Sequence, residues 1–126
     1  MPRTVYPILQ YRDPRAAIDW LERAFGFEPA LVHEGPDGRI GHAELRCGDH
    51  RVMLSGARDG DGPHVGKGWC YVVVADADAH HAQAVAAGAE ITMPLTDLEY
   101  GSRDYGARDP EGNDWSFGTY DPWAAG

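Results

Sequence analysis

The sequence is poor in cysteine and in positive charge, and it has no long apolar run. Its two cysteines, Cys47 and Cys70, form neither a CxxC pair nor a zinc-knuckle spacing, so we expect no disulfide framework and no structural zinc site. No segment reaches the length of a membrane span, and no basic stretch followed by an apolar one opens the chain. These absences favour a cytoplasmic protein with free thiols.

The scarcity of positive charge limits the partners that the protein can have. There are 11 Lys and Arg residues against 20 Asp and Glu residues, which gives a net charge of −9. Because no basic cluster is available to neutralise phosphates, neither a nucleic acid nor a membrane is expected as a partner. The acidic balance leaves room for a cationic small ligand. A length of 126 residues suits one domain with its own core.

Several catalytic motifs are also absent. The sequence has no P-loop, no GxGxxG after a predicted strand and no GxSxG elbow, which disfavours the common nucleotide-binding and hydrolase sites. Neither cysteine has a recognisable histidine partner, so both are interpreted as small buried residues. His80 and His81 are adjacent on a predicted helix and do not form the i, i+4 pair that binds metals, so we expect them on a solvated face.

Two halves of the chain repeat one local pattern. In the first half a strand over 5–11 precedes a helix capped by Asp13, and in the second a strand over 69–75 precedes a helix capped by Asp76 or Asp78. The apolar positions expected to face the core are Ala17, Trp20, Leu21, Ala24 and Phe25 in the first helix and Ala82, Val85, Ala86 and Ala89 in the second.

The two halves are related by a fixed offset. Asp13 and Asp76 are 63 residues apart, and so are the turns at Gly48 and Glu111, which indicates a duplicated unit. Three strands are expected after each helix, at 30–34, 39–47 and 51–55 and at 90–95, 103–108 and 113–120. We therefore predict an α+β fold in a single domain, with two βαβββ units whose sheets cover each other or curl into a shared cup. The predicted parts are module one (4–56), a linker (57–68) and module two (69–122).

The segment 109–118, DPEGNDWSFG, is a turn followed by an alternating strand. Asp109 can cap the turn, and Gly112 can adopt the positive φ that ends it. Trp115 and Phe117 share one face of the strand and are predicted to lie in the core, whereas Ser116 faces the other way.

This organisation resembles the vicinal oxygen chelate superfamily, which includes glyoxalase I, the extradiol dioxygenases and the bleomycin-resistance proteins. The resemblance covers nearly the whole chain and rests on YPILQYRDPRAAIDWLERAFGF, HAEL and YGSRDYGARDPEGNDWSFG. It implies two tandem βαβββ modules in a cup-shaped mixed sheet and a homodimer, as in the bleomycin-resistance branch. It does not fix a function, because the fold also serves lyases, oxygenases and epimerases.

Metal-dependent members of that superfamily place ligands on the cup side of four strands. The matching positions here are Tyr6, Met53, Cys70 and Ser116. The resemblance thus implies a site without the His and Glu ligands that Zn²⁺, Fe²⁺ or Mn²⁺ prefer. We expect no metal and no other cofactor.

Two further pairs of residues are candidates for the cup. His42 and Glu44 are two apart on a predicted strand and therefore share a face, where they could act as acid, base or ligand anchor, or form a structural pair. Tyr100 and Arg103 follow a predicted rim loop, where they would suit a flat or partly anionic ligand or simply lie on the surface.

These features lead to two main hypotheses. The first is metal-independent binding or sequestration of a small organic ligand, which could be a cationic antibiotic-like compound, in a cup at a dimer interface. Its lining would be Tyr6, His42, Glu44, Met53, Cys70, Tyr100, Arg103 and Ser116. The alternative is a glyoxalase-like lyase or isomerase, or a dioxygenase, that uses His42 and Glu44. A cup filled by side chains that binds nothing is a third possibility.

Overall fold

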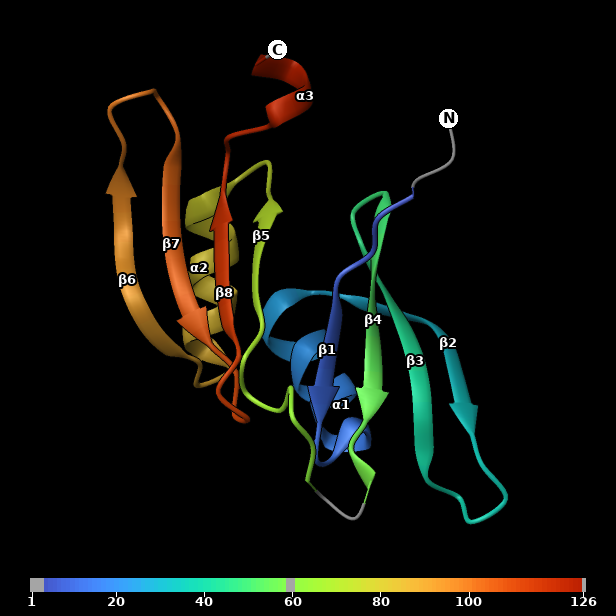
Figure 1. Ribbon diagram of the computed structural model, residues 1–126. Coiled ribbons are helices and arrows are strands. Elements are labelled where there is room, and N and C mark those ends of the chain that lie inside the picture. The colour runs from blue at the N-terminus through green and yellow to red at the C-terminus, as the bar shows by residue number, and fades with distance from the viewer. Residues whose placement is uncertain (1–3, 59–60, 126) are drawn as a thin grey trace.

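The protein contains two four-stranded sheets, each associated with one helix (Figure 1). The computed structural model describes residues 4–58 and 61–125. The first module contains β1 (Ile8–Tyr11), α1 (Pro14–Phe25), β2 (Glu28–Glu34), β3 (Ile40–Cys47) and β4 (His50–Gly56). The second contains β5 (Trp69–Val73), α2 (Ala77–Ala86), β6 (Glu90–Asp97), β7 (Arg103–Arg108) and β8 (Asp114–Gly118), followed by the short α3 (Pro122–Ala125).

The two sheets have the same topology. Their strand orders are β1-β4-β3-β2 and β5-β8-β7-β6, with one parallel pair and two antiparallel pairs in each. The predicted α+β fold of two tandem βαβββ modules is therefore confirmed. The first strand begins at Ile8 rather than at residue 5, and the last ends at Gly118 rather than at residue 120. No helix among the described residues is long and apolar enough to cross a membrane.

Helix α1 has the predicted boundaries and the predicted buried face. The side chain of Asp13 accepts a hydrogen bond from the backbone N–H of Ala16, and Gly26 ends the helix at a φ of 74°. The buried residues of α1 include four of the five predicted ones, and Trp20 packs against them while partly exposed. The apolar stripe thus directs the helix onto its sheet.

Helix α2 is capped by Asp76, one of the two predicted caps, but its buried face differs from the prediction. Val85 is 49% exposed, and the buried residues are Ala77 and Ala84. His80 lies on that buried side, where one ring nitrogen contacts the Tyr105 hydroxyl at 2.5 Å and the other contacts the Phe25 carbonyl oxygen at 3.0 Å. The expected solvated position of His80 is wrong because two hydrogen bonds satisfy its ring inside the protein.

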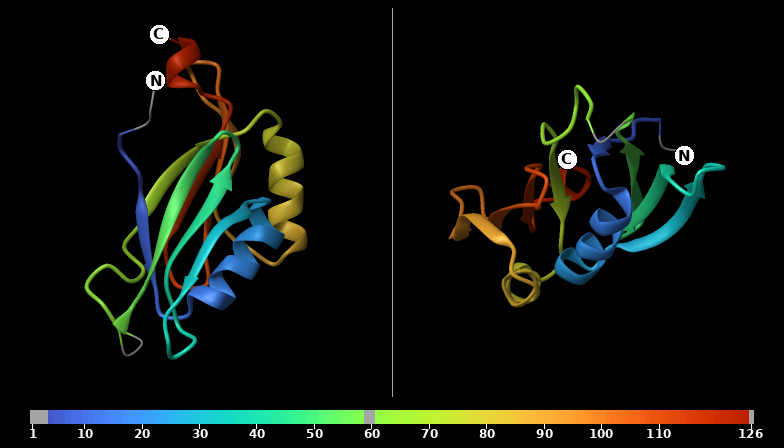
Figure 2. Two further views of the ribbon diagram at one scale, coloured as in Figure 1. Left: turned by 90° about the vertical axis from the view of Figure 1, so that its right-hand side faces the viewer. Right: turned by 90° about the horizontal axis from the view of Figure 1, so that it is seen from below.

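One core joins the two modules. The ring of Phe25, at the end of α1, lies 4.6 Å from that of Phe117 and 5.6 Å from that of Trp115, both on β8. Trp115 and Phe117 are buried, as predicted. Helices α1 and α2 also contact each other and lie on the same side of the molecule (Figure 2). The helix-facing sides of the two sheets are therefore covered.

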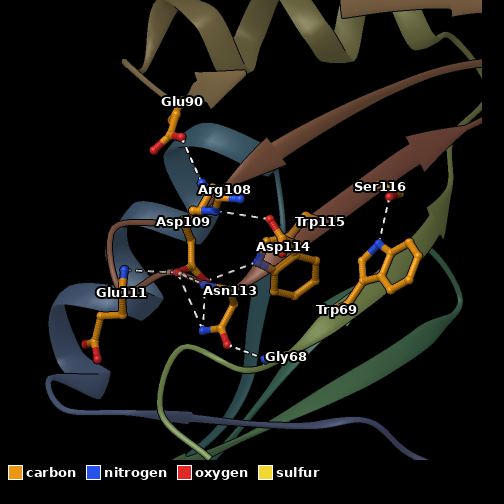
Figure 3. A network of polar contacts seen from close by, with 10 residues as sticks. All are labelled: Gly68, Trp69, Glu90, Arg108, Asp109, Glu111, Asn113, Asp114, Trp115 and Ser116. Atoms are coloured by element: carbon orange, nitrogen blue, oxygen red, sulfur yellow. Dashed lines mark hydrogen bonds and ion pairs between the residues drawn. The ribbon is translucent and has the colours of Figure 1, made fainter. Parts of the chain in front are cut away.

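The DPEG turn of the second module is attached to the first module. The Asp109 carboxylate accepts a hydrogen bond from the Tyr11 hydroxyl at 2.5 Å. It also accepts hydrogen bonds from the Trp115 indole N–H at 3.1 Å and from Asn113 (Figure 3). Glu111 accepts from the backbone N–H groups of residues 12 and 13 at 2.6 and 2.9 Å. Gly112 has a φ of 98°, as the turn requires.

Candidate functional site

Each sheet has an open face, defined here as the side turned away from α1 and α2. Residues alternate between the two sides of a strand, so the buried Ala43 and Leu45 on β3 mark the helix side of the first sheet. His42 and Glu44 therefore lie on its open face, opposite Ser55 and Met53 of β4. The predicted common face of His42 and Glu44 is confirmed.

Three charged or polar groups interact on this first open face. The imidazole Nε2 of His42 lies 3.0 Å from the Glu44 carboxylate, and the Arg51 guanidinium donates to the same carboxylate at 2.8 Å. The hydrogen bonds from His42 and Arg51 lower the pKa of Glu44. A carboxylate held in this way is a good anchor for a hydrogen-bond donor and a weakened general base.

The open face of the second sheet has an exposed aromatic row on β5. Trp69 and Tyr71 project from it together with Val73, and Trp69 is 78% exposed. The indole N–H of Trp69 donates to the Ser116 hydroxyl at 3.0 Å, which orients the ring across β8 (Figure 3). Ser116 thus has the predicted orientation, away from the core.

Asp104 is a further polar group on the second open face. It stands opposite Gly118 on β8, and its carboxylate Oδ1 accepts hydrogen bonds from the hydroxyls of Tyr71, at 3.2 Å, and Ser102. A Cβ atom on Gly118 would lie 1.9 Å from this oxygen, so the glycine makes room for the carboxylate. Our sequence reasoning missed Asp104, although its alternation with the buried Tyr105 could have indicated its side of the strand.

Two of the expected lining residues lie on the helix side instead. Cys70 pairs with Trp115 and packs against the core, whereas its neighbours Trp69 and Tyr71 face outward. Arg103 shares its side of β7 with the buried Tyr105 and forms ion pairs with Asp78 of α2 and Asp97 of β6, both at 3.0 Å. These contacts raise the pKa of Arg103 and leave its guanidinium engaged away from the open face.

The other expected residues lie near the ends of the sheets. Tyr6 precedes β1, and its ring lies 5.3 Å from that of His50 at the start of β4. Tyr100 lies in the turn between β6 and β7 and packs edge-on against Tyr120 at a ring distance of 5.4 Å. The single chain therefore brings His42, Glu44 and Met53 together on one sheet and holds Ser116 on the other.

The thiols of Cys47 and Cys70 do not have the lowered pKa of a reactive cysteine. Burial raises the pKa of Cys47 to about 12 and also raises the pKa of Cys70. Both side chains are partly buried and unpaired, in agreement with the predicted free thiols. At neutral pH they are protonated and serve as small packing residues.

Two hollows lie on the helix side of the molecule. One, of about 230 Å³, lies between α1 and the DPEG turn, and the other, of about 340 Å³, lies between the end of α1 and the start of α2. The oxygens of Asp109 and Glu111 in the first hollow and the ring nitrogens of His80 in the second already have protein partners. The open faces are better candidates, because groups there remain available to a ligand.

Comparison with known proteins agrees with this architecture. Residues 3–117 match the sequence model of the Glyoxalase/Bleomycin resistance protein/Dioxygenase superfamily. The chain belongs to this superfamily.

The chain is similar over most of its length to several known proteins. TioX from Micromonospora sp. ML1 is 37% identical, with a TM-score of 0.76 over 91% of this chain and 98% of TioX. The bleomycin-binding protein of Streptomyces verticillus, in complex with copper(II)-bleomycin, is 24% identical, with a TM-score of 0.71 over 96% of this chain and all of that one. An uncharacterized protein of Mycobacterium tuberculosis is 33% identical over 89% of this chain and 71% of its own length.

The side chains at the positions where the resemblance implies metal ligands do not fit a metal. Tyr6, Met53 and Ser116 supply a phenol, a thioether and a hydroxyl, and Cys70 faces the core. Zn²⁺, Fe²⁺ and Mn²⁺ prefer imidazole and carboxylate ligands in proteins. Within residues 4–58 and 61–125, no group of three or more His, Cys, Asp and Glu side chains could hold an ion.

Proposed function

We propose that this superfamily member binds a small organic molecule without a metal, on the open faces of its sheets. The observation that carries the proposal is Trp69, a large aromatic side chain that is 78% exposed yet oriented by its hydrogen bond to Ser116. An exposed indole held in a fixed orientation is a stacking surface for a planar ligand. Tyr71 and the His42–Glu44 pair supply further contacts of the kind that orient ligands.

A homodimer is part of the proposal. Ile8 and Leu31 on the first sheet, like the β5 row on the second, are exposed apolar side chains. A single chain would leave a ligand on either face open to water, whereas most small-molecule sites bury the greater part of the ligand. Pairing of an open face with that of a second chain would cover these side chains and enclose the ligand between them.

The net charge and the relatives support an antibiotic-like, cationic ligand. A charge of −9 attracts cations over the surface as a whole. The fold is shared with a protein that binds copper(II)-bleomycin, and TioX is a closer relative in sequence. The proposed role in the cell is therefore sequestration or carriage of such a compound in the cytoplasm.

Thermal-shift measurements test this function. The purified protein is heated with a panel of cationic and aromatic compounds that includes metal-free bleomycin, with and without EDTA. A ligand should raise Tm in a concentration-dependent way, because it binds the folded state, and EDTA should not change the result. The shift should fall in Trp69→Ala and persist in Val85→Ala, which alters an exposed residue of α2. Absence of a shift with every compound would contradict the proposal.

The second candidate function is a glyoxalase-like lyase or isomerase, or a dioxygenase. The contact of 3.0 Å between His42 and Glu44 favours it, because such a pair can transfer protons. The lowered pKa of Glu44 makes this carboxylate a weak base, so we rank the enzyme second. Turnover of the glutathione adduct of methylglyoxal that disappears in Glu44→Gln would favour it. Stoichiometric Zn, Ni, Fe or Mn in the purified protein would contradict the metal-free proposal.

A further inference from the structure

Asp104 is almost completely buried, but only one of its two carboxylate oxygens accepts hydrogen bonds from the described residues. The residue is 5% exposed, and within the described residues its carboxylate accepts two hydrogen bonds, both at Oδ1, from Tyr71 and Ser102. No fully buried side-chain oxygen in the described part of the chain lacks a hydrogen-bond partner. Oδ2 of Asp104 makes no hydrogen bond within the described residues, so it is not among the fully buried oxygens and keeps some contact with the solvent. It is therefore an available acceptor on a side chain of the open face.

The charge of Asp104 has no counter-ion within the described residues. Both of its hydrogen-bond donors are neutral hydroxyls, and no Lys, Arg or His side chain forms an ion pair with it. By contrast Asp114, on the same open face, is paired with Arg108 at 3.1 Å. A largely buried carboxylate without a cation is costly, and a cation brought by a ligand would remove that cost.

The surroundings of Asp104 restrict the shape of such a ligand. The Tyr71 hydroxyl reaches Asp104 across Gly118, where a Cβ atom would lie 2.3 Å from that hydroxyl. Trp69 lies two residues before Tyr71 on the same face, and its ring is tied to Ser116. An acceptor and an exposed indole plane therefore lie on one face, separated by the phenol of Tyr71.

We propose that Asp104 is the specificity residue of the open face and that it accepts a hydrogen bond from a protonated nitrogen of a planar aromatic ligand. Trp69 stacks on the planar part of that ligand, and Oδ2 of Asp104 pairs with its cationic N–H group. This inference rests on the proposed binding function and adds the chemical class of the ligand, a planar organic cation.

Two related dyes test the inference on the full-length protein. Proflavine is a planar cation at pH 7.5, and acridine has the same ring system and is largely neutral. Titrations followed by dye fluorescence should show that the wild-type protein binds proflavine at least about tenfold more tightly, since charged hydrogen bonds have this magnitude. Equal affinity for the two dyes would overturn the inference without the use of any variant.

Three variants distinguish the effect of the Asp104 charge on dye affinity from the effect of stacking on Trp69. Asp104→Asn keeps an acceptor for Tyr71 and Ser102, and it should weaken proflavine binding by about tenfold to a hundredfold while acridine binding changes less than about twofold. Asp114→Asn is the matched control, because it removes a charge of the same face that is already paired, and both affinities should persist. Trp69→Leu should weaken both dyes.

The outcomes distinguish this inference from the function on which it rests. If Asp104→Asn binds proflavine like the wild type, the assignment of Asp104 is wrong while binding on the open face stands. If the wild type binds neither dye, the inference is overturned, and the wider thermal-shift panel decides separately whether the protein binds small organic molecules at all. A thermal unfolding curve of each variant establishes that it is folded.

Discussion

Asp109 takes part in the attachment of the two modules to each other. Its two oxygens accept hydrogen bonds from the side chains of Tyr11, Asn113 and Trp115 and from backbone N–H groups of its own turn. Only one of these partners, Tyr11, belongs to the first module, and it is 98 residues away in the sequence.

The first prediction concerns the Tyr11 hydroxyl. Tyr11→Phe should lower the free energy of unfolding by about 1.5–3 kcal/mol, because the variant removes the donor of a buried hydrogen bond to the Asp109 carboxylate. Urea unfolding measures the loss. The control is Tyr120→Phe, since the Tyr120 hydroxyl makes no hydrogen bond within the described residues, and it should stay near the wild type. Equal stability of Tyr11→Phe and wild type would mean that this contact does not stabilise the folded state.

A second prediction at the level of residues concerns His80 and pH. Burial lowers the pKa of His80 below its ordinary value of 6.5, so the folded protein favours the neutral ring. The neutral ring of His80 therefore contributes fully to the free energy of unfolding above about pH 6.5, the pKa of the unfolded chain. This contribution is lost as the pH falls below 6.5 and through the lower pKa of the folded protein. Unfolding free energies of the wild type should decrease between pH 7.5 and pH 5.5.

Variants at neighbouring positions isolate the effect of His80. His80→Asn should reduce the difference between the two pH values, because residue 80 then no longer takes up a proton on unfolding. His81→Gln changes the adjacent histidine, which makes no hydrogen bond to Phe25 or Tyr105, and should retain the wild-type difference. A pH dependence that is identical in all three proteins would show that other groups cause it.

Among the structural elements, strand β5 shows why the composition of the site was only partly predictable. The resemblance to the superfamily implies that Cys70 lies on the cup side, whereas in the structure it lies on the core side. A strand alternates with a period of two, so an error of one residue exchanges the two faces completely. The outward residues Trp69 and Tyr71 were consequently missed. By contrast Ser116, next to the buried Trp115 and Phe117, was oriented correctly because its strand alternates clearly.

Helix α2 shows a different limit of sequence reasoning. Alanine occupies both exposed and buried positions of this helix, so its pattern defines no single apolar stripe. The buried side is decided by His80, whose partners Phe25 and Tyr105 come from α1 and β7. Contacts between distant elements are invisible in a local pattern. The caps act within four residues, and the sequence predicted Asp13 for the first helix and Asp76 as one of two candidates for the second.

The third prediction concerns the close contact between β7 and β8. Gly118→Ala would place a Cβ atom 1.9 Å from the Asp104 carboxylate and 2.3 Å from the Tyr71 hydroxyl. We expect a loss of about 1–3 kcal/mol in unfolding free energy, which is typical of overpacking. Gly41→Ala is the control, since a Cβ there meets no atom within 4 Å, and its stability should change by less than about 0.5 kcal/mol. Equal losses in the two variants would contradict the close packing at Gly118.

For the whole molecule, the duplication predicted the two modules but not how they meet. The 63-residue offset indicated two equivalent units, and the two sheets do have equivalent strand orders. Their junction is asymmetric, however, because Phe25 of the first module packs on Trp115 and Phe117 of the second. As a result, α1 and α2 lie on one side of the molecule, and the open faces of the two sheets, which no described helix covers, lie on the other (Figure 2). Uncovered apolar faces favour association with another surface.

The last prediction is that association of the open faces makes the protein a dimer. Ile8 is 60% exposed on the open face of the first sheet, where it pairs with Met53 of β4. A charge introduced there would be buried without a partner in the dimer, so Ile8→Glu should shift the protein to monomer in sedimentation experiments at micromolar concentration. Val85→Glu adds the same charge to an exposed residue of α2 and should leave the dimer intact. If the wild type sediments as a monomer, or Ile8→Glu as a dimer, the two open faces do not pair, and a ligand would have to bind to one face alone.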